Sequence, residues 1–422
     1  MGETKGTLEG WKVTFAGTGI NLALGVLYAW SILSGGLTGW TETMKSLPYS
    51  LACGVFAITM IPAGRLQDRI GPRWVATVSG LLTGIGFILC WAYTSFAGFL
   101  VGFGLLVGIG IGFGYAAATP PAIKWFHASR TGLIAGLVVS GFGLASAYIG
   151  PLARTMIDEW GLQTSMLVMG LSFLVIVVGL AQFLKNPPAG YVPPVPASAG
   201  AKKQSAAAAP ARDVEPGKMV RTSQFWMLWV MYACGAGAGL MIIGKLKPIV
   251  KNASDLAWFA PLCLAILAVG NAGGRIIAGV LSDKLGRFTT MLVIFLLQAA
   301  VMMGLIFVGS EPAVVVGVSL MGGFNYGANL SLFPSATKDL FGLKNFGVNY
   351  GILFTAWGVG GVVLPIVAGR VADATGSFNL AYIVAAVCLV LASIMTFFIR
   401  RGDGPAASTV GAKVGEAGAA VK

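Results

Sequence analysis

The sequence predicts an all-α membrane protein whose twelve transmembrane helices form two pseudo-symmetric six-helix bundles. Of its 422 residues, 56% are hydrophobic and 10% are charged, whereas soluble globular domains have about 25% charged residues. Apolar runs of about 20 residues, the length that crosses a bilayer, recur along the whole chain. Landmarks in the first half of the chain also return in the second half.

The expected helices are the apolar runs bounded by charged residues, Gly and Pro. They cover about 11–34, 47–67, 74–94, 97–123, 130–153, 162–184, 223–249, 258–281, 288–309, 312–336, 345–370 and 377–400. A stretch rich in Pro and Ala after the sixth run is typical of a flexible connector. The expected domains are an N-terminal bundle (1–184), a cytoplasmic connector (185–222), a C-terminal bundle (223–400) and a cytoplasmic tail (401–422).

The formal net charge is +13. Its Lys and Arg residues are scattered among alternate loops, which argues against a nucleic-acid partner. By the positive-inside rule these loops and both termini are cytoplasmic. The five cysteines lie in apolar runs without metal-ligand spacing, so we expect small buried side chains and no metal. No cofactor, catalytic constellation or obligate protein partner is indicated, and the surroundings are membrane lipid.

The two halves share three landmarks at offsets of 211 to 215 residues. GRLQDRIGPR at 64–73 returns as GVLSDKLGR at 279–287, and GFGY at 112–115 returns as GFNY at 323–326. The third pair is Pro151 with Pro365, each near the end of a predicted helix. Parallel repeats of this kind place a substrate near the membrane midplane, between halves that rock.

The repeated loop after the second and eighth helices resembles the motif of the major facilitator superfamily, and this resemblance covers the whole chain. The small Gly allows helices to approach closely, and the Asp can meet a helix N-terminus. In the family this loop latches one conformation, whereas the alternative is that its charges only set the topology. The expected gating residues are Gly64, Asp68, Arg69, Arg73, Asp283, Lys284 and Arg287.

A finer resemblance rests on four short motifs. EGW at 9–11 is similar to the start of helix 1 in monocarboxylate transporters. RTSQFWMLW at 221–229, LFPS at 332–335 and NYG at 349–351 resemble the oxalate/formate antiporter branch. Both branches have an Arg in helix 8, where Arg275 stands, so the resemblance implies a carboxylate transporter of a bacterial inner membrane.

Arg275 lies well inside an apolar run, where an unpaired guanidinium costs at least about 2.5 kcal/mol. A fixed cation at that depth suits an anion, and the fork of Arg matches a carboxylate. Asn271, one turn away, is expected to orient the fork or to touch the substrate. The alternative is that Arg275 extends to the cytoplasmic surface near Asp283.

The expected apolar wall of the site is aromatic. Tyr115 and Tyr326, on the central helices 4 and 10, combine a ring with a hydroxyl, although both residues suit ordinary packing as well. The remaining wall candidates are Leu27, Tyr28, Phe354 and Trp357. Dicarboxylate exchangers of the oxalate branch have a second cation at or near the position of Trp357, so its absence favours a substrate with one carboxylate.

We therefore expect a transporter that moves a small monocarboxylate, such as L-lactate or pyruvate, with a proton by alternating access. No Asp or Glu lies in the middle of a predicted helix, so no proton carrier is identified. Two alternatives stay open. One is a carboxylate/carboxylate antiporter of the oxalate/formate type, and the other is a membrane sensor with this fold that does not transport.

Overall fold

The computed structural model describes residues 2–194, 213–253, 259–308 and 311–401. The first six membrane spans are formed by α1 (Gly2–Leu24) continued by α2 (Trp30–Leu33), α3 (Glu42–Ile70), α4 (Pro72–Ala92), α5 (Phe96–Phe99) continued by α6 (Gly108–Lys124), and α7 (Thr131–Ala181), which contains two spans. After the four-residue α9 (Pro216–Met219), the last six are α10 (Ser223–Ala253), α11 (Phe259–Leu285), α12 (Arg287–Val308), α13 (Pro312–Phe341), α14 (Phe346–Thr375) and α15 (Asn379–Arg401).

Ten described helical stretches are long and apolar enough to cross a membrane. One of them, Ala128–Ala181, is 54 residues long, which is more than twice the length of about 20 residues that one span needs. α1 with its continuation adds a further span, so the described residues contain the twelve that the sequence predicts. The predicted all-α, multi-pass fold is confirmed.

The turn between the fifth and sixth spans depends on Gly161. Its φ of 76° lies in the left-handed region, which glycine adopts without steric penalty. The fifth span therefore continues to Trp160, seven residues beyond the predicted end at 153. The predicted boundary fell short because residues 154–160 are mostly polar and only the apolar part of the helix carries the sequence signal.

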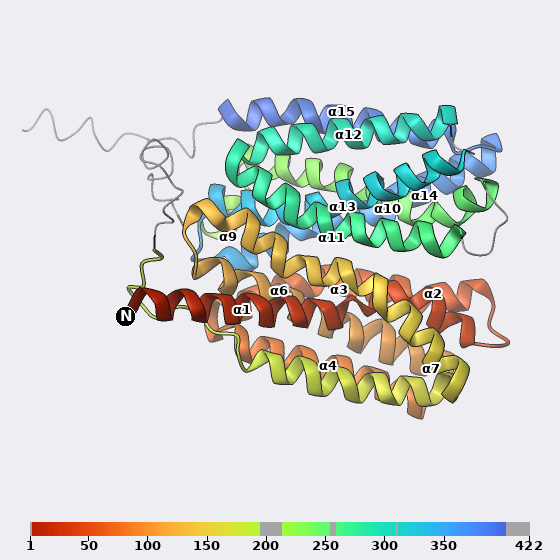
Figure 1. Cartoon of the computed structure of the whole chain (residues 1–422), viewed down its shortest axis with the longest axis horizontal. Coiled ribbons are helices and arrows are strands. Elements are labelled where there is room, and N and C mark those ends of the chain that lie inside the picture. The colour runs from red at the N-terminus through yellow and green to blue at the C-terminus, as the bar shows by residue number, and fades with distance from the viewer. Residues whose placement is uncertain (1, 195–212, 254–258, 309–310, 402–422) are drawn as a thin grey trace, which may run out of the picture.

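The first six spans and the last six form two adjacent groups (Figure 1). α1, α3, α4, α6 and α7 occupy the lower part of that view, and α10 to α15 occupy the upper part. Much of the predicted connector, residues 195–212, and the tail after Arg401 lie outside the described residues.

One offset of 215 residues relates the two groups. A methyl group added to Gly112 would lie 3.1 Å from the carbonyl oxygen of Phe56, and one added to Gly327 would overlap that of Asn271. Both members of the second pair follow those of the first by 215 residues. The same helix crossing is therefore built twice.

This offset corrects one prediction from the repeats. Gly112 corresponds to Gly327, and not to Gly323 as the similar motifs indicate. Tyr115 and Tyr326 therefore differ by one helical turn in their position along equivalent helices. The short GFxY pattern recurs at the wrong turn because α13 is rich in small residues there.

Candidate functional site

Arg275 is the centre of the candidate site. Its side chain on α11 is fully buried, and its Nε donates a hydrogen bond of 2.9 Å to Oδ1 of Asn271. One terminal nitrogen donates to the carbonyl oxygen of Val139 on α7, in the other group of helices. The second terminal nitrogen, Nη2, is buried without a hydrogen-bond partner. Arg275 therefore does not extend to the surface, and one arm of its fork is open.

The surroundings of Arg275 leave its charge uncompensated. Of the described Lys and Arg side chains, only Arg275, Arg287 and Lys338 are buried, and the latter two have carboxylate partners. A buried cation without a counter-ion is costly. An anion bound to the open arm would remove that cost.

Asn271 fixes the orientation of the guanidinium rather than leaving it free. A methyl group added to Gly143 of α7 would lie 3.1 Å from Nε of Arg275 and 3.2 Å from Oδ1 of Asn271. The absence of a side chain at Gly143 thus leaves room for this pair. Between the two predicted roles of Asn271, the structure shows the orienting contact.

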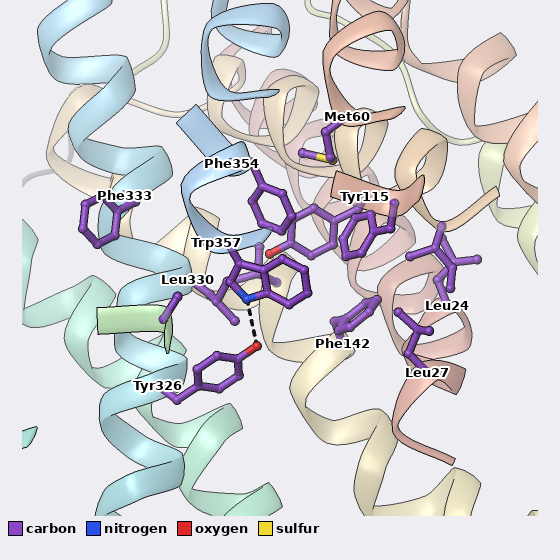
Figure 2. Close-up of a cluster of buried hydrophobic side chains, with 14 of the residues drawn as sticks. Leu24, Leu27, Met60, Tyr115, Phe142, Tyr326, Leu330, Phe333, Phe354 and Trp357 are labelled. Atoms are coloured by element: carbon purple, nitrogen blue, oxygen red, sulfur yellow. Dashed lines mark hydrogen bonds between the residues drawn. The ribbon is translucent and has the colours of Figure 1, made fainter. Parts of the chain in front are cut away.

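Aromatic rings from both groups of helices meet beside this pair (Figure 2). Phe354 stacks on Trp357 with ring centroids 5.0 Å apart, and it lies 5.5 Å from Tyr115 and 5.2 Å from Phe56. Phe142 of α7 lies 5.5 Å from Tyr115. The cluster is therefore a continuous apolar wall across the junction of the two groups.

The other predicted wall residues belong to the same cluster. Nε1 of Trp357 donates a 3.0 Å hydrogen bond to the hydroxyl of Tyr326. Tyr28 lies edge-on to Phe142 at 5.5 Å, and the buried Leu27 packs into the cluster. The charge of Arg275 acts electrostatically on the hydroxyls of Tyr115 and Tyr326, so the wall and the cation share one environment.

Sequence reasoning missed four residues of this environment. Phe56 and Phe142 complete the wall, and Tyr232 and Tyr350 add two hydroxyls. The 215-residue offset would have found the first two, because Phe56 corresponds to Asn271 and Phe142 to Trp357. Without the correct offset, an aromatic residue in an apolar helix looks like ordinary packing.

The predicted gating loops join the two groups at the predicted cytoplasmic end. On one side Asp283 accepts hydrogen bonds from the backbone N–H groups of Gly132 (2.8 Å) and Leu133 (2.9 Å), at the start of α7. On the other, Asp68 accepts from Gly347 (3.2 Å) and Val348 (3.1 Å), at the start of α14. A carboxylate at a helix N-terminus is favoured by its free N–H groups and dipole.

Two glycines allow these contacts to form. A methyl group on Gly64 would overlap the carbonyl oxygen of Gly347, and one on Gly279 would overlap that of Gly132. The helices thus approach with their backbones in contact.

The charged partners of the two loops differ. Arg287 binds Asp283 at 2.6 Å and Asp339 at 2.8 Å. Arg73 is exposed and donates to Gln182 within its own group of helices, while Arg69 and Lys284 are exposed. The structure therefore places Gly64, Asp68, Asp283 and Arg287 at the latch, and Arg69 and Arg73 at the surface.

Comparison with known proteins adds to this geometry. The sequence profile of the Major Facilitator Superfamily matches residues 11–336. The MFS-type transporter YhjX of Escherichia coli is 28% identical over 355 residues, covering 83% of this chain and 85% of YhjX. The oxalate:formate antiporter of Oxalobacter formigenes is 26% identical over 386 residues (90% and 89%). Monocarboxylate transporter 13 of Bos taurus is 24% identical over 336 residues (78% and 74%).

A solved structure matches the fold. The crystal structure of the transporter FucP in the outward conformation superposes with a TM-score of 0.70 at 18% identity, covering 92% of this chain and 99% of FucP.

Proposed function

Because the chain belongs to the major facilitator superfamily of membrane transporters, we propose that it moves a small monocarboxylate, such as L-lactate or pyruvate, together with a proton. The direction is across a bacterial inner membrane, with both termini in the cytoplasm. The observation that carries the proposal is the open, buried arm of Arg275.

The number of cations supports one carboxylate. A carboxylate accepts two parallel hydrogen bonds from a guanidinium, and the Nη2 of Arg275 offers one at once. The second comes from the nitrogen now bound to Val139, whose carbonyl the substrate replaces. No second buried cation without a partner is found in the described part of the chain. One carboxylate neutralises the site.

The aromatic wall supports a short apolar tail. Phe354, Trp357 and Tyr115 present ring faces and edges to the same environment as Arg275. Sites for small ligands combine such walls with a few placed polar groups. The named relatives, an oxalate:formate antiporter and a monocarboxylate transporter, support the same class of substrate.

Alternating access follows from the latches. Asp68 and Asp283 hold the predicted cytoplasmic end closed by binding the starts of α14 and α7. Release of both carboxylates would open that end while the opposite end closes. With a carboxylate bound, Arg275 is part of a neutral pair that crosses the dry step easily, and the proton travels with the substrate or through water near Arg275.

Exchange is the second candidate, and one observation favours it. No Asp or Glu is among the buried side chains of the described residues, so the interior offers no carboxyl group to carry a proton. An antiporter of the oxalate/formate type needs none.

Uptake of labelled acetate, lactate, pyruvate and oxalate into proteoliposomes tests both candidates. Symport predicts that an inside-alkaline gradient drives accumulation of lactate or pyruvate without internal substrate. Uptake that ignores the gradient and requires internal carboxylate would establish exchange instead.

A further inference from the structure

Two tyrosine hydroxyls beside the candidate site have no role in the account so far. The hydroxyl oxygens of Tyr232 on α10 and Tyr350 on α14 lie 3.4 Å apart, and both side chains are buried. The ring of Phe354 contacts both, at centroid distances of 6.1 and 5.8 Å. The hydroxyl pair therefore borders the wall proposed for the substrate.

The hydrogen-bonding capacity of this pair is not filled. Only one proton can lie between two hydroxyl oxygens, so the other hydroxyl keeps a proton to donate. The separation of 3.4 Å also exceeds the usual value of about 2.7–2.8 Å for such bonds. The nearby hydroxyl of Tyr115 makes no hydrogen bond of normal geometry. Buried donors without acceptors are unfavourable, and a ligand oxygen would satisfy them.

These hydroxyls lie within electrostatic reach of the cation. The charge of Arg275 acts on the hydroxyls of Tyr115 and Tyr232, and the hydroxyls of Tyr115 and Tyr350 act on each other. A small acid whose carboxylate binds Arg275 therefore brings its adjoining carbon toward the three hydroxyls.

We propose that Tyr232 and Tyr350 bind an oxygen on the carbon next to the substrate carboxylate, which makes the protein selective for 2-hydroxy and 2-oxo monocarboxylates. This inference rests on the proposed function and narrows its substrate class. An apolar wall alone distinguishes a hydroxyl from a hydrogen only weakly, whereas buried hydrogen-bonding groups reject a ligand that leaves them unpaired. Both tyrosines are specificity-determining residues in this account.

Lactate and propionate test the inference, because they differ only in the 2-hydroxyl. Initial uptake of both acids is measured in the same proteoliposomes, with protein-free vesicles in parallel to subtract diffusion of the free acids. The parent is expected to prefer lactate. Tyr232→Phe and Tyr350→Phe should each lower the lactate-to-propionate ratio by about tenfold, through slower lactate uptake with propionate uptake maintained.

Tyr148→Phe is the matched control, because its hydroxyl binds the carbonyl oxygen of Leu22 away from Arg275. Its ratio should equal that of the parent. An unchanged ratio in both site variants, or an equal fall in uptake of the two acids, would overturn the inference. Arg275→Ala is measured alongside: carboxylate flux that survives its loss would instead overturn the proposed function.

Discussion

Met60 and Arg275 occupy equivalent positions in the two groups of helices, 215 residues apart. The carbonyl oxygen of Met60 on α3 lies against Gly351 of α14, and that of Arg275 on α11 lies against Gly136 of α7. The same backbone crossing therefore carries a thioether in one group and a guanidinium in the other. The second group supplies the charge of the site, and the first supplies an apolar surface.

Asn271→Asp is expected to make substrate affinity fall as pH rises. The new carboxylate, when ionised, would pair with Arg275 at the place where Asn271 now accepts a hydrogen bond. It would then compete with the substrate, and protonation at lower pH would release the cation. Uptake kinetics between pH 5.5 and 8, a range chosen around the titration expected for a carboxyl with a pKa raised by burial, should show KM rising by about tenfold.

Asn271→Ala is the control for that experiment, because it removes the acceptor without adding a charge. Its KM should rise at every pH to a similar degree. A pH profile that is the same for Asn271→Asp and Asn271→Ala would show that the two side chains do not interact as proposed.

Gly64→Val and Gly279→Val should prevent closure of the predicted cytoplasmic end. Added side chains would collide with the backbones of Gly347 and Gly132. A cysteine replacing the buried Val348, in a background without native cysteines, should react faster with a water-soluble maleimide, and transport should be lost. Gly54→Val, on α3 with open space around it, should change neither; equal labelling in all variants would exclude this role.

Trp357→Lys is expected to admit dicarboxylates. A second cation would face the far end of a substrate held by Arg275, so oxalate should inhibit lactate uptake at concentrations about tenfold lower than in the parent. Loss of the hydrogen bond to Tyr326 and burial of the new charge should lower stability by roughly 1–3 kcal/mol. Trp357→Phe, which keeps the wall, should not gain oxalate inhibition; a gain there would contradict the charge argument.

Glu9, before the first predicted span, should contribute stability only above acidic pH. Hydrogen bonds from Lys12 (2.8 Å) and Lys185 (2.6 Å) lower the pKa of the Glu9 carboxyl from 4.5 to about 2. The contribution is therefore complete above pH 4.5 and is lost as the pH falls toward 2. Because the pair is exposed, Glu9→Gln should cost at most about 1 kcal/mol at pH 7.

Thermal unfolding in detergent at pH 7 and pH 3 tests this expectation. The difference in melting temperature between parent and Glu9→Gln should shrink at pH 3. A difference that grows on acidification would show that the Lys12 and Lys185 contacts do not act in this way.

The sequence predicted the parts of the site that are chemically conspicuous. A cation inside an apolar run, Arg275, stands out because burying it is costly, and the repeated Asp68 and Asp283 stand out among glycines. Phe56 and Phe142 could not be found in the same way, because aromatic residues are common in any apolar helix. Their contribution depends on which helices meet, and that information is in the tertiary fold.

The most direct test of the central claim is carboxylate uptake by proteoliposomes containing Arg275→Ala or Arg275→Lys, compared with the parent at equal folded protein. Loss of the charged, two-pronged donor should reduce uptake of lactate and pyruvate by at least about 100-fold in Arg275→Ala. Arg275→Lys should retain a small part of the flux, since it keeps the charge without the fork. Undiminished carboxylate flux in a correctly folded Arg275→Ala protein would contradict the account.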